Sequence, residues 1–436
     1  MSQGSRIPGF YKLPLDERRR RVAERAGVKL QRILDVVGRG GLDPDTADKI
    51  VENVLGVYSL PFGIALNVQV NGHDRLTPMV VEEPSVIAAA SNAARMVRAG
   101  GGFCAEMIEE LMTSQVQVFD VPEPGAAIGR LEAASAELLE MGTRAVPGLV
   151  ARGGGPRAIE VRDLGQRCLV VHVLVDCRDA MGANLVNTIA ETIGPRVQEL
   201  SGGQLGLRIL SNLSDHRRVR TTCRVHAREL AIARQAGGVE TSERERAIEG
   251  REVIDGIVQA SRFAELDPYR AATHNKGIMN GVDAVVLATG NDFRAVEAGA
   301  HAFAARSGRY APLAVWRRDG DDLVGELEMP LALGTVGGTL RVHPGARLAL
   351  KLMGVKEASD LIMTAASVGL ASNLAALRAL ATEGIQRGHM SLHARSIAIA
   401  AGATGDEVEQ VASAICDAGG VTVEAAEAEL ARLRGA

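Results

Sequence analysis

Four segments of the chain place a titratable side chain beside glycine, proline or asparagine, and some of them lie where a strand is expected to give way to a helix. Functional sites in α/β architectures are usually built at such junctions. A carboxylate can move a proton, an ammonium can hold a developing oxyanion, and an imidazole can donate a proton near neutral pH. The candidates for this carbonyl-directed chemistry are Glu83, Lys276, Asp292 and His389.

Each candidate also has a simpler structural interpretation, which the residues alone leave open. The carboxylates of Glu83 and Asp292 could cap the helices that follow them, and Lys276 could lie on a surface turn. Only six of the 49 basic residues are Lys, and Lys276 is the single Lys between positions 49 and 351, although codon bias towards Arg would produce the same isolation. His389 and His393 have the i, i+4 spacing of metal ligands, but no third ligand follows nearby, so no metal site is predicted.

Standard catalytic and nucleotide-binding signatures are missing from the sequence. It contains no G-x-x-x-x-G-K-[ST], no G-x-G-x-x-G after a strand, no H-E-x-x-H and no G-x-S-x-G. The glycine triplet at 100–102 is therefore interpreted as a turn and not as a phosphate-binding loop. Because no motif marks a cysteine or serine nucleophile, proton transfer and oxyanion stabilisation remain the chemistry of the four candidates.

Composition excludes several classes of protein. A net charge of -4 and an aromatic content of 3% provide neither the basic surface nor the stacking platforms of a nucleic-acid-binding protein. The five cysteines are scattered and lack C-x-x-C spacing, which favours a reducing compartment. The first residues are polar and charged, and the longest apolar segments, such as Leu169–Cys177, are too short for a membrane helix. We therefore expect a cytoplasmic protein with no membrane span and no nucleic-acid partner.

Turn chemistry predicts the elements around the first candidate carboxylate. Asn71-Gly72 predicts a hairpin whose strands are Ala65–Val70 and Leu76–Val81. The Ala-rich segment Val86–Val97 predicts a helix, and Pro84 is expected in its first turn, where a missing N–H costs nothing. The carboxylate should then lie between a strand and the N-terminus of a helix.

A chain of 436 residues is long enough for two or three domains, and its middle third differs in character from the rest. Strands mixed with helices over about 100 residues favour an inserted α+β domain. The predicted strands are Val116–Val121, Ile159–Val161, Cys168–Cys177 and Gly206–Leu210, and the predicted helices cover 130–141 and 182–199. Further along, we expect a strand at Ala284–Leu287, a helix at Phe293–Ala305 and mostly helices after 357.

Seven segments in the same order resemble 3-hydroxy-3-methylglutaryl-coenzyme A (HMG-CoA) reductase, specifically the soluble class II bacterial form. The resemblance covers nearly the whole chain. It is carried by Glu52-Asn53-Val54-Leu55-Gly56 with Leu60-Pro61, Val81-Glu82-Glu83-Pro84-Ser85, Asp179-Ala180-Met181-Gly182-Ala183-Asn184, Asp267-Pro268-Tyr269-Arg270, His274-Asn275-Lys276-Gly277, Ala288-Thr289-Gly290-Asn291-Asp292 and Gly388-His389-Met390.

The resemblance implies interconversion of HMG-CoA with mevalonate and coenzyme A through two successive hydride transfers. Lys276 would hold the oxyanion of the hemithioacetal and then polarise the aldehyde, and Asp292 would pair with Lys276. Glu83 would manage the proton on the aldehyde oxygen, and His389 would protonate the departing thiolate. The expected substrate neighbours are Ser85, Arg270 and Asn280, with Arg270 gripping the terminal carboxylate. The alternative is a coenzyme A-thioester lyase or acyltransferase that works without nicotinamide.

The resemblance also implies a dinucleotide site in a small domain that is not a Rossmann fold. The residues assigned to it are Asp179, Met181, Gly182, Ala183, Asn184 and Asn212. NAD is the expected cofactor, and the degradation of mevalonate the expected direction. NADP is the alternative because Arg144 lies where an acidic residue can contact the adenosine ribose, although Glu140 could replace that acid. Ser372 stands where some relatives have Gln near the substrate, so that contact stays open.

The expected architecture is therefore α+β with three parts. Residues 1–110 and 212–384 would form a large, mainly helical domain that binds substrate and coenzyme A, and 111–211 would form the small inserted α+β dinucleotide-binding domain. Residues 385–436 would form a mobile helical C-terminal flap that carries His389. The resemblance further implies a homodimer with a shared active site, or a trimer of such dimers.

Overall fold

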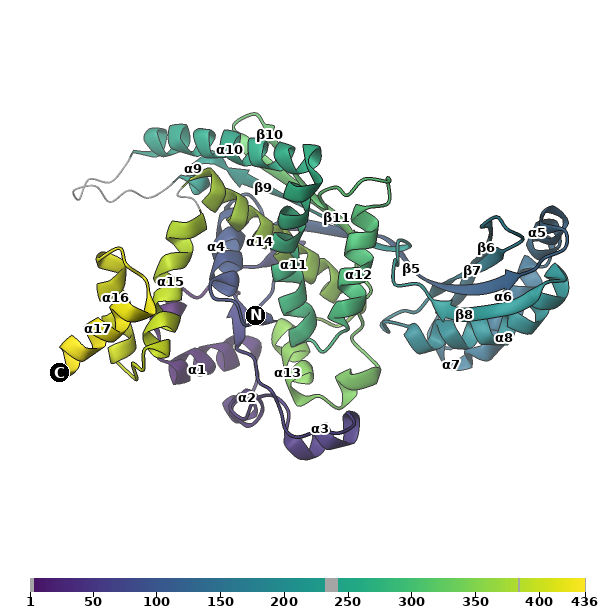
Figure 1. Cartoon of the computed structure of the whole chain (residues 1–436), viewed down its shortest axis with the longest axis horizontal. Coiled ribbons are helices and arrows are strands. Elements are labelled where there is room, and N and C mark those ends of the chain that lie inside the picture. Colours follow the sequence, from purple (N-terminus) through teal and green to yellow (C-terminus); the bar gives the residue numbers. More distant parts are fainter. Residues whose placement is uncertain (1–3, 232–241, 383–384, 436) are drawn as a thin grey trace.

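The computed structural model describes residues 4–231, 242–382 and 385–435, and the side chains at 244, 339 and 385–392 are outside this description. Figure 1 shows three bodies: a central body of helices around a sheet, a smaller α+β body to its right and the C-terminal helices to its left. The fold is mixed α+β, as expected.

A single long strand, β5 (Phe103–Phe119), runs from the central body into the smaller one. Residues 103–110 of β5 pair antiparallel with β9 (Arg217–His226), and residues 111–118 pair antiparallel with β7 (Leu169–Asp176). The strand order is β10-β11-β9-β5-β2-β3 in the central body and β6-β7-β5-β8 in the smaller one. Both bodies are therefore connected by continuous backbone hydrogen bonding along β5.

The small domain consists of a four-stranded sheet and its covering helices. All neighbouring strands in this sheet are antiparallel, which distinguishes it from the parallel sheet of a Rossmann domain. Residues from β5, β7 and the long helix α8 form one apolar core. Its other elements are α5 (Pro124–Ala133), α6 (Ser135–Ala145), α7 (Pro147–Val150), β6 (Gly155–Asp163), α8 (Ala183–Ser201) and β8 (Gln204–Leu210).

The large domain is built around helix α14 (Ala358–Ala381), which packs against α11, α4 and α10. This 24-residue helix is apolar and long enough to cross a membrane, contrary to the expectation that no segment approaches that length. Because 78% of its most apolar stretch is buried inside the molecule, it serves here as a core helix. Trp316, fully buried, donates its Nε1–H to Asn373 Oδ1 of α14 at 2.7 Å and so joins the sheet to this helix.

The remaining elements of the large domain cover its sheet and the ends of α14. The N-terminal half contains η1 (Phe10–Lys12), α1 (Leu15–Ala26), α2 (Leu30–Val37), α3 (Pro44–Ile50), β1 (Phe62–Ala65), β2 (Gln69–Val70), β3 (His73–Asp74), β4 (Thr77–Val80) and α4 (Val86–Ala99). The second half contains α9 (Ala227–Leu230), α10 (Glu243–Leu266), α11 (Pro268–Ala288), α12 (Phe293–Ala304), β10 (Ala314–Asp319), β11 (Asp322–Pro330), η2 (Gly338–Arg341) and α13 (Pro344–Met353).

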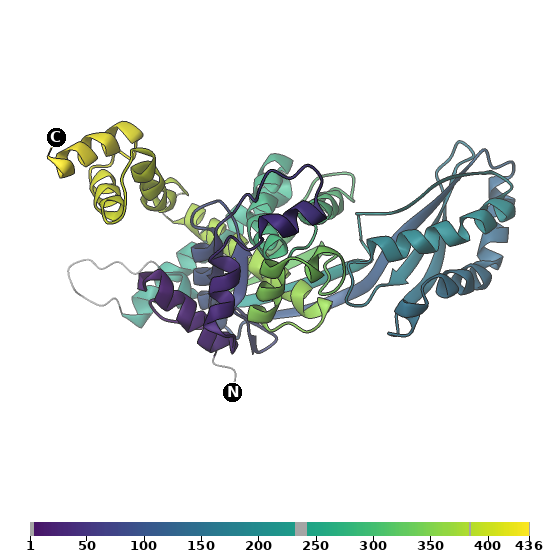
Figure 2. The same ribbon diagram turned by 90° about the horizontal axis from the view of Figure 1, so that it is seen from below.

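Three helices form the C-terminal part, and they project from the large domain in Figure 2. They are α15 (Ile385–Ala400), α16 (Glu407–Asp417) and α17 (Val423–Arg434). Ala394, Val411, Ile415 and Leu430 belong to an apolar cluster that these helices share. The C-terminal part therefore has a small core of its own.

Two local predictions hold in part, and one is wrong. Asn71-Gly72 does form the tight turn between β2 and β3, but the longer pairing of this region is between β1 and β4. Pro84 precedes the helix, because α4 begins at Val86. Ala284–Leu287 is not a strand but the last turn of α11. Its valines favour a strand locally, yet a short apolar run cannot be distinguished from a buried helix by periodicity.

Candidate active site

The side chains of Lys276 and Glu83 meet although 193 positions separate them in the chain. Lys276 Nζ donates to Glu83 Oε2 at 2.8 Å. Lys276 lies in the middle of α11, and Glu83 follows β4, which packs against that helix. The side chains are 61% and 33% exposed, so the pair opens to solvent and can receive a ligand. The sequence had suggested a polar turn at Lys276, and this is corrected to a helix interior.

The backbone at Ser85 is held in an uncommon conformation next to this pair. Ser85 is the N-cap of α4 and has φ of 77°, in the left-handed region that non-glycine residues rarely adopt. Its Oγ is buried and has no hydrogen-bond partner among the described residues. A strained residue with an orphan hydroxyl beside a Lys–Glu pair is typical of a ligand-binding position.

Helix α11 is anchored by the two residues that precede Lys276. Asn275 is fully buried, donates to Tyr310 Oη and Ala311 O at 3.0 Å each, and accepts from Leu313 N at 2.9 Å. His274 Nε2 lies 3.0 Å from Ala314 O, and burial lowers the pKa of this imidazole to about 4. Both side chains therefore fix the helix and are not candidates for proton transfer, whereas Lys276 points away from the core.

Helix α11 also carries two of the residues predicted to bind the substrate, Arg270 and Asn280. Arg270 lies in the first turn, which Asp267 caps by accepting from the main-chain N–H of Tyr269 and Arg270. Burial lowers the pKa of the Arg270 guanidinium, for which no hydrogen bond is found among the described side chains. Asn280 lies one turn after Lys276 and is half-buried. An unpaired, half-buried guanidinium suits a ligand carboxylate.

Asp292 occupies the N-cap of α12 and does not contact Lys276. Its Oδ1 accepts from the main-chain N–H of Arg294 and Ala295, both at 3.1 Å. Its side chain is 44% exposed, with Arg294 Nε at 3.6 Å. The simpler interpretation as a helix cap is thus correct for the single chain, and the expected pairing with Lys276 is not found there. His389 lies in α15, but its side chain is outside the described residues.

The predicted dinucleotide segment forms the turn between β7 and α8. Gly182 is the N-cap of α8 with φ of 103°, and a Cβ there would lie 2.4 Å from Cys177 Sγ. Ala183 and Asn184 begin the helix, and Asn184 is exposed. No side chain caps this 19-residue helix, so its first N–H groups stay available to an anion such as a pyrophosphate.

The first residue of that segment has a structural contact that sequence reasoning missed. Asp179 Oδ1 accepts from Ala358 N at the start of α14 at 2.8 Å, so this carboxylate joins the turn to the large domain. Met181 is half-buried, and Asn212 is exposed in the connection from β8 to β9. Asn212 therefore lies in the segment that leads from the small domain back to the large one, and not in the turn 179–184.

The structure also shows where Arg144 and Glu140, the residues considered for cofactor choice, and Ser372 lie. Arg144 and Glu140 form an exposed ion pair on α6, with Nη1 and Oε1 3.1 Å apart. Ser372 is 7% exposed within α14, and its Oγ is close enough to α11 that a Cβ at Gly281 would lie 2.4 Å away. Ser372 is therefore buried where α14 packs on α11, and its Oγ has no hydrogen-bond partner among the described residues.

A carboxyl pair that sequence reasoning missed lies further along α11. Asp283 is two turns after Lys276, and burial together with Glu297 of α12 raises the pKa of Asp283 to about 8. Glu297 Oε2 is 2.6 Å from His301 Nε2, and His301 Nδ1 is 2.7 Å from Tyr310 Oη, which accepts from Asn275. A line of polar contacts thus connects α12 to the residue before Lys276. A lone Asp in an apolar run is the only sequence signal for it.

Replacing Asp283 with Asn should make stability less dependent on pH. The folded carboxyl keeps its proton up to a pKa of about 8, whereas the unfolded one loses it near 3.8, so the native state binds more protons between these values. Wild-type stability should therefore fall as pH rises through this window. Thermal unfolding of both proteins at pH 6 and pH 8 tests this, and we expect Asp283→Asn to gain about 2 °C relative to wild type at the higher pH. Equal slopes would contradict the assignment.

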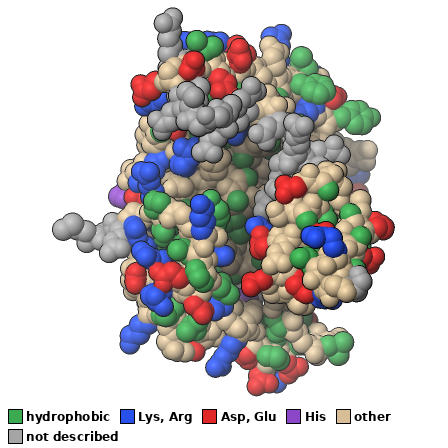
Figure 3. All heavy atoms as spheres, turned by 90° about the vertical axis from the view of Figure 1, so that its left-hand side faces the viewer, with side chains coloured by type: hydrophobic (Ala, Val, Ile, Leu, Met, Phe, Trp, Pro, Cys, Tyr) green, Lys and Arg blue, Asp and Glu red, His purple; other side chains and the backbone are tan. Residues whose placement is uncertain are grey.

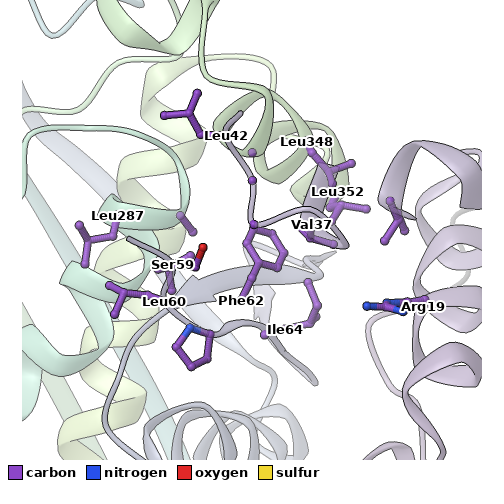
Figure 4. Close-up of a pocket in the computed structure, with 18 of the residues that line it drawn as sticks. Arg19, Val37, Leu42, Ser59, Leu60, Phe62, Ile64, Leu287, Leu348 and Leu352 are labelled. Atoms are coloured by element: carbon purple, nitrogen blue, oxygen red, sulfur yellow. The ribbon is translucent and has the colours of Figure 1, made fainter. Parts of the chain in front are cut away.

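A separate pocket of about 600 Å³ opens between the N-terminal helices and α13. Phe62, Leu42, Leu60 and Leu348 point into it in Figure 4, and Leu287 reaches it from the end of α11. Of the candidate catalytic residues that the structure describes, Glu83, Lys276 and Asp292 do not line this pocket. Its apolar lining therefore does not belong to the Lys276–Glu83 pair.

The face at the C-terminal-helix end of the molecule carries mixed charge. Acidic and basic side chains both occur over the part visible in Figure 3.

The antiparallel small domain, the buried helix α14 and the Lys276–Glu83 contact together describe a mixed α+β protein with a candidate acid–base pair on α11. Residues 14–394 match the sequence model of hydroxymethylglutaryl-coenzyme A reductase. The HMG-CoA reductase of Archaeoglobus fulgidus is 47% identical over 99% of this chain and 96% of its own length. The chain belongs to the hydroxymethylglutaryl-coenzyme A reductase family.

Solved structures agree with this assignment and identify the class. The HMG-CoA reductase of Streptococcus pneumoniae superposes with a TM-score of 0.81 at 40% identity, covering 98% of this chain and 99% of that one. The class II enzyme of the same species, bound to NADPH in open conformations, gives a TM-score of 0.80 at 41% identity over 86% and 99% of the two chains. The chain resembles class II enzymes throughout.

The activity follows from the family. The enzyme interconverts HMG-CoA with mevalonate and coenzyme A by two successive hydride transfers with a nicotinamide cofactor. The alternative of a lyase or acyltransferase without nicotinamide is therefore set aside.

Proposed function

We propose that Lys276 and Glu83 form the acid–base centre of this reaction. The observation that carries the proposal is the 2.8 Å contact between Lys276 Nζ and Glu83 Oε2 on a solvent-open face. An ammonium at this place can stabilise the oxyanion of the hemithioacetal and then polarise the aldehyde carbonyl. Glu83 lies within hydrogen-bond reach of the ammonium and, in its protonated form, can supply the proton that the aldehyde oxygen needs.

Three residues around this pair are proposed to hold the substrate. The unpaired guanidinium of Arg270 would bind the terminal carboxylate of HMG-CoA through two parallel hydrogen bonds. The orphan hydroxyl of Ser85 would gain a partner when substrate enters, which would satisfy its buried Oγ. Asn280, one turn after Lys276 on α11, would bind a polar group next to the reacting carbonyl.

His389 is proposed to protonate the coenzyme A thiolate, on the resemblance of Gly388-His389-Met390 alone. Its helix α15 and the small domain lie at opposite ends of the molecule in Figure 1. We therefore propose that residues 385–436 act as a flap that moves, or that serves the site of a second copy. Domain 111–211 would bind the dinucleotide, and 1–110 with 212–384 would bind substrate and coenzyme A.

Replacing His389 with Gln should separate the two reduction steps. Without a proton donor the released thiolate can recapture the aldehyde, so reduction of HMG-CoA should fall by about 10²-fold or more. Reduction of added mevaldehyde, which needs no thiolate protonation, should stay near the wild-type rate. Both rates are read from absorbance at 340 nm. Equal losses on the two substrates would count against this role.

We propose that the cofactor binds at the turn 179–184 and that NADH is preferred over NADPH. The cofactor supplies the hydride, and the open N-terminus of α8 can bind its phosphates. The exposed pair of Arg144 with Glu140 supports NADH because it neutralises the cation that a 2′-phosphate would require. Against this, a 41% identical relative is described with NADPH bound.

The ratio of kcat/KM for NADH and NADPH tests this preference. We expect the ratio to exceed one and to fall in Glu140→Gln, which frees Arg144. Glu199 on α8 offers a control, because Glu199→Gln removes the same charge elsewhere in the small domain, while Arg196 keeps its second partner, Glu137, at 2.8 Å. A wild-type ratio below one would overturn the NADH proposal and support NADPH.

We propose a homodimer with a shared site, or a trimer of such dimers, in the cytoplasm. Leu55 and Tyr58 support an association because both large side chains are almost fully exposed, 105% and 90%, in the connection between α3 and β1. The separation of Asp292 from Lys276 in one chain supports a shared site, in which Asp292 of one copy would complete the centre of another. Sedimentation velocity should show at least twice the chain mass, and a monomer would contradict this.

The proposed direction of the reaction is mevalonate degradation.

A further inference from the structure

Arg217, the first residue of β9, carries a buried charge at the point where the chain passes between the two domains. It is 3% exposed, and its guanidinium donates to four main-chain carbonyls. The accepting oxygens are those of Ala180 at 2.9 Å, Met181 at 3.2 Å, Arg178 at 3.2 Å and Leu333 at 2.9 Å. Burial lowers the pKa of this group. Burying a charge that is held by carbonyls and not by a carboxylate costs free energy. We therefore look for the contribution of Arg217 in the fixed positions of the four carbonyls that it binds.

Three of those carbonyls belong to the turn that leads into α8, and the fourth belongs to the segment 333–336, here called the bridging segment. Ala180 and Val336 form a parallel β-bridge, and Thr335 N donates to Asp179 O at 2.8 Å. A Cβ on Gly334 would lie 2.6 Å from Met181 N and 3.0 Å from Asp179 O. The turn and the bridging segment are therefore in close backbone contact that only glycine permits.

The other side of the bridging segment contacts the loop that carries Asp292. Asn291 donates through Nδ2 to Gly334 O at 3.2 Å and accepts through Oδ1 from Gly334 N at 2.8 Å. Asn291 directly precedes Asp292, the N-cap of α12. One layer of backbone thus separates the Asp292 loop from the proposed dinucleotide turn.

We propose that Arg217 and Gly334 are positioning residues, which hold the dinucleotide turn at a set distance from the Asp292 loop. The inference rests on the proposed assignment of 179–184 to the dinucleotide. Arg217 binds the carbonyls of the turn and the carbonyl of Leu333 at the same time. Gly334 has no side chain, so the backbones of the turn and of the bridging segment can come into contact. Because hydride transfer depends strongly on the separation of the reacting atoms, a displaced turn should impair dinucleotide use while leaving HMG-CoA binding intact.

Two variants test this proposal by independent means in the full-length enzyme. Gly334→Ala adds one methyl group that pushes the turn away, and Arg217→Met removes the four hydrogen bonds. Each should raise the dissociation constant of NADH and of NADPH, measured by nucleotide fluorescence without HMG-CoA, by about tenfold or more. The KM for HMG-CoA should stay within about twofold of wild type.

Matched controls separate positioning from general destabilisation. Arg218 lies next in β9 but pairs with Glu328 at 2.8 Å on a part-exposed face, so Arg218→Met should leave both constants unchanged. Arg217→Lys should recover part of the dinucleotide affinity, because an ammonium can still donate to some of the carbonyls. It also provides the test if Arg217→Met does not fold, as judged by thermal unfolding. Folded Gly334→Ala or Arg217→Lys enzyme with unchanged dinucleotide affinity, or with equal losses for both ligands, would overturn the proposal.

A third variant distinguishes failure of the positioning role from failure of the site assignment. Asn184→Asp places a carboxylate in the first turn of α8, which favours the helix but repels the anionic dinucleotide. Weaker dinucleotide binding in Asn184→Asp with no effect of Gly334→Ala would retain the site and reject the positioning role. Unchanged binding in Asn184→Asp would reject both.

Discussion

Replacing Lys276 with Met is expected to lower kcat for both HMG-CoA and mevaldehyde by about 10²–10³-fold, the usual effect of removing one donor from a developing oxyanion. The proposed oxyanions of the two steps are on the oxygen of the same reacting carbon. Removal of the Lys276 ammonium should therefore slow both steps. Met keeps most of the length of the side chain and removes only the charge. Turnover is measured by absorbance at 340 nm with each substrate.

The fold should survive this change. The Lys276–Glu83 pair is part-exposed, and such pairs contribute about 0–1 kcal/mol. His274 and Asn275 make the contacts that fix this part of α11, and both remain in place. Loss of activity without a change in Tm would therefore assign the effect to chemistry.

Lys276→Arg is the informative companion variant. It retains a positive charge, but the guanidinium is broader and far less acidic than the ammonium, so it should not restore turnover. Substantial activity in Lys276→Met would remove Lys276 from the centre of the mechanism. High activity in Lys276→Arg alone would mean that charge, and not the compact ammonium, is what the reaction requires.

Replacing Glu83 with Gln is expected to lower the rate of mevaldehyde reduction by about 10²–10⁴-fold, the range of general acid catalysis. Gln has the same shape, and its carbonyl oxygen can accept from Lys276 Nζ as Glu83 Oε2 does at 2.8 Å. The position of the ammonium is thus retained, whereas the variant loses the carboxyl group that can carry the transferable proton and, with it, one negative charge. Rates with mevaldehyde are compared with those of wild type at the same cofactor concentration.

The neighbouring Glu82 provides a matched control. It is an exposed carboxylate in the same loop, so Glu82→Gln changes the local charge equally. The left-handed backbone of Ser85 is common to both variants and keeps the loop in shape. A similar loss of mevaldehyde reduction in both variants would assign the effect to the charge of the loop. An unchanged rate in Glu83→Gln would mean that another group protonates the aldehyde oxygen.

Local sequence patterns predict the fold class and several elements well. Alternation and turn residues locate β6, β7, β8 and the Asn71-Gly72 turn, whereas the strand expected at Val116–Val121 is only the end of the much longer β5 (Phe103–Phe119). These features depend on neighbours within a few residues, so the sequence contains their cause. The resemblance to HMG-CoA reductase is confirmed by the family match, and it rests on ordered motifs that no single pattern would distinguish.

The contacts between distant segments could not be predicted in the same way. The strand expected at Ala284–Leu287 is helical because α11 is buried between α14 and β4, and tertiary packing overrides the local preference of valine. The carboxyl pair Asp283–Glu297 and the carbonyls around Arg217 belong to different elements. Nothing in their neighbourhood along the chain marks them.

The sequence by itself determined which groups are available for chemistry: an isolated Lys in a chain rich in Arg, two loop carboxylates and a His after Gly388. Only the tertiary structure decided which of them meet. Packing of β4 on α11 brings Glu83 to Lys276 across 193 positions, whereas Asp292, only 16 positions from Lys276, is used to cap α12. Residue type sets the chemistry a group can perform, but proximity depends on burial of the apolar faces of the elements that carry it.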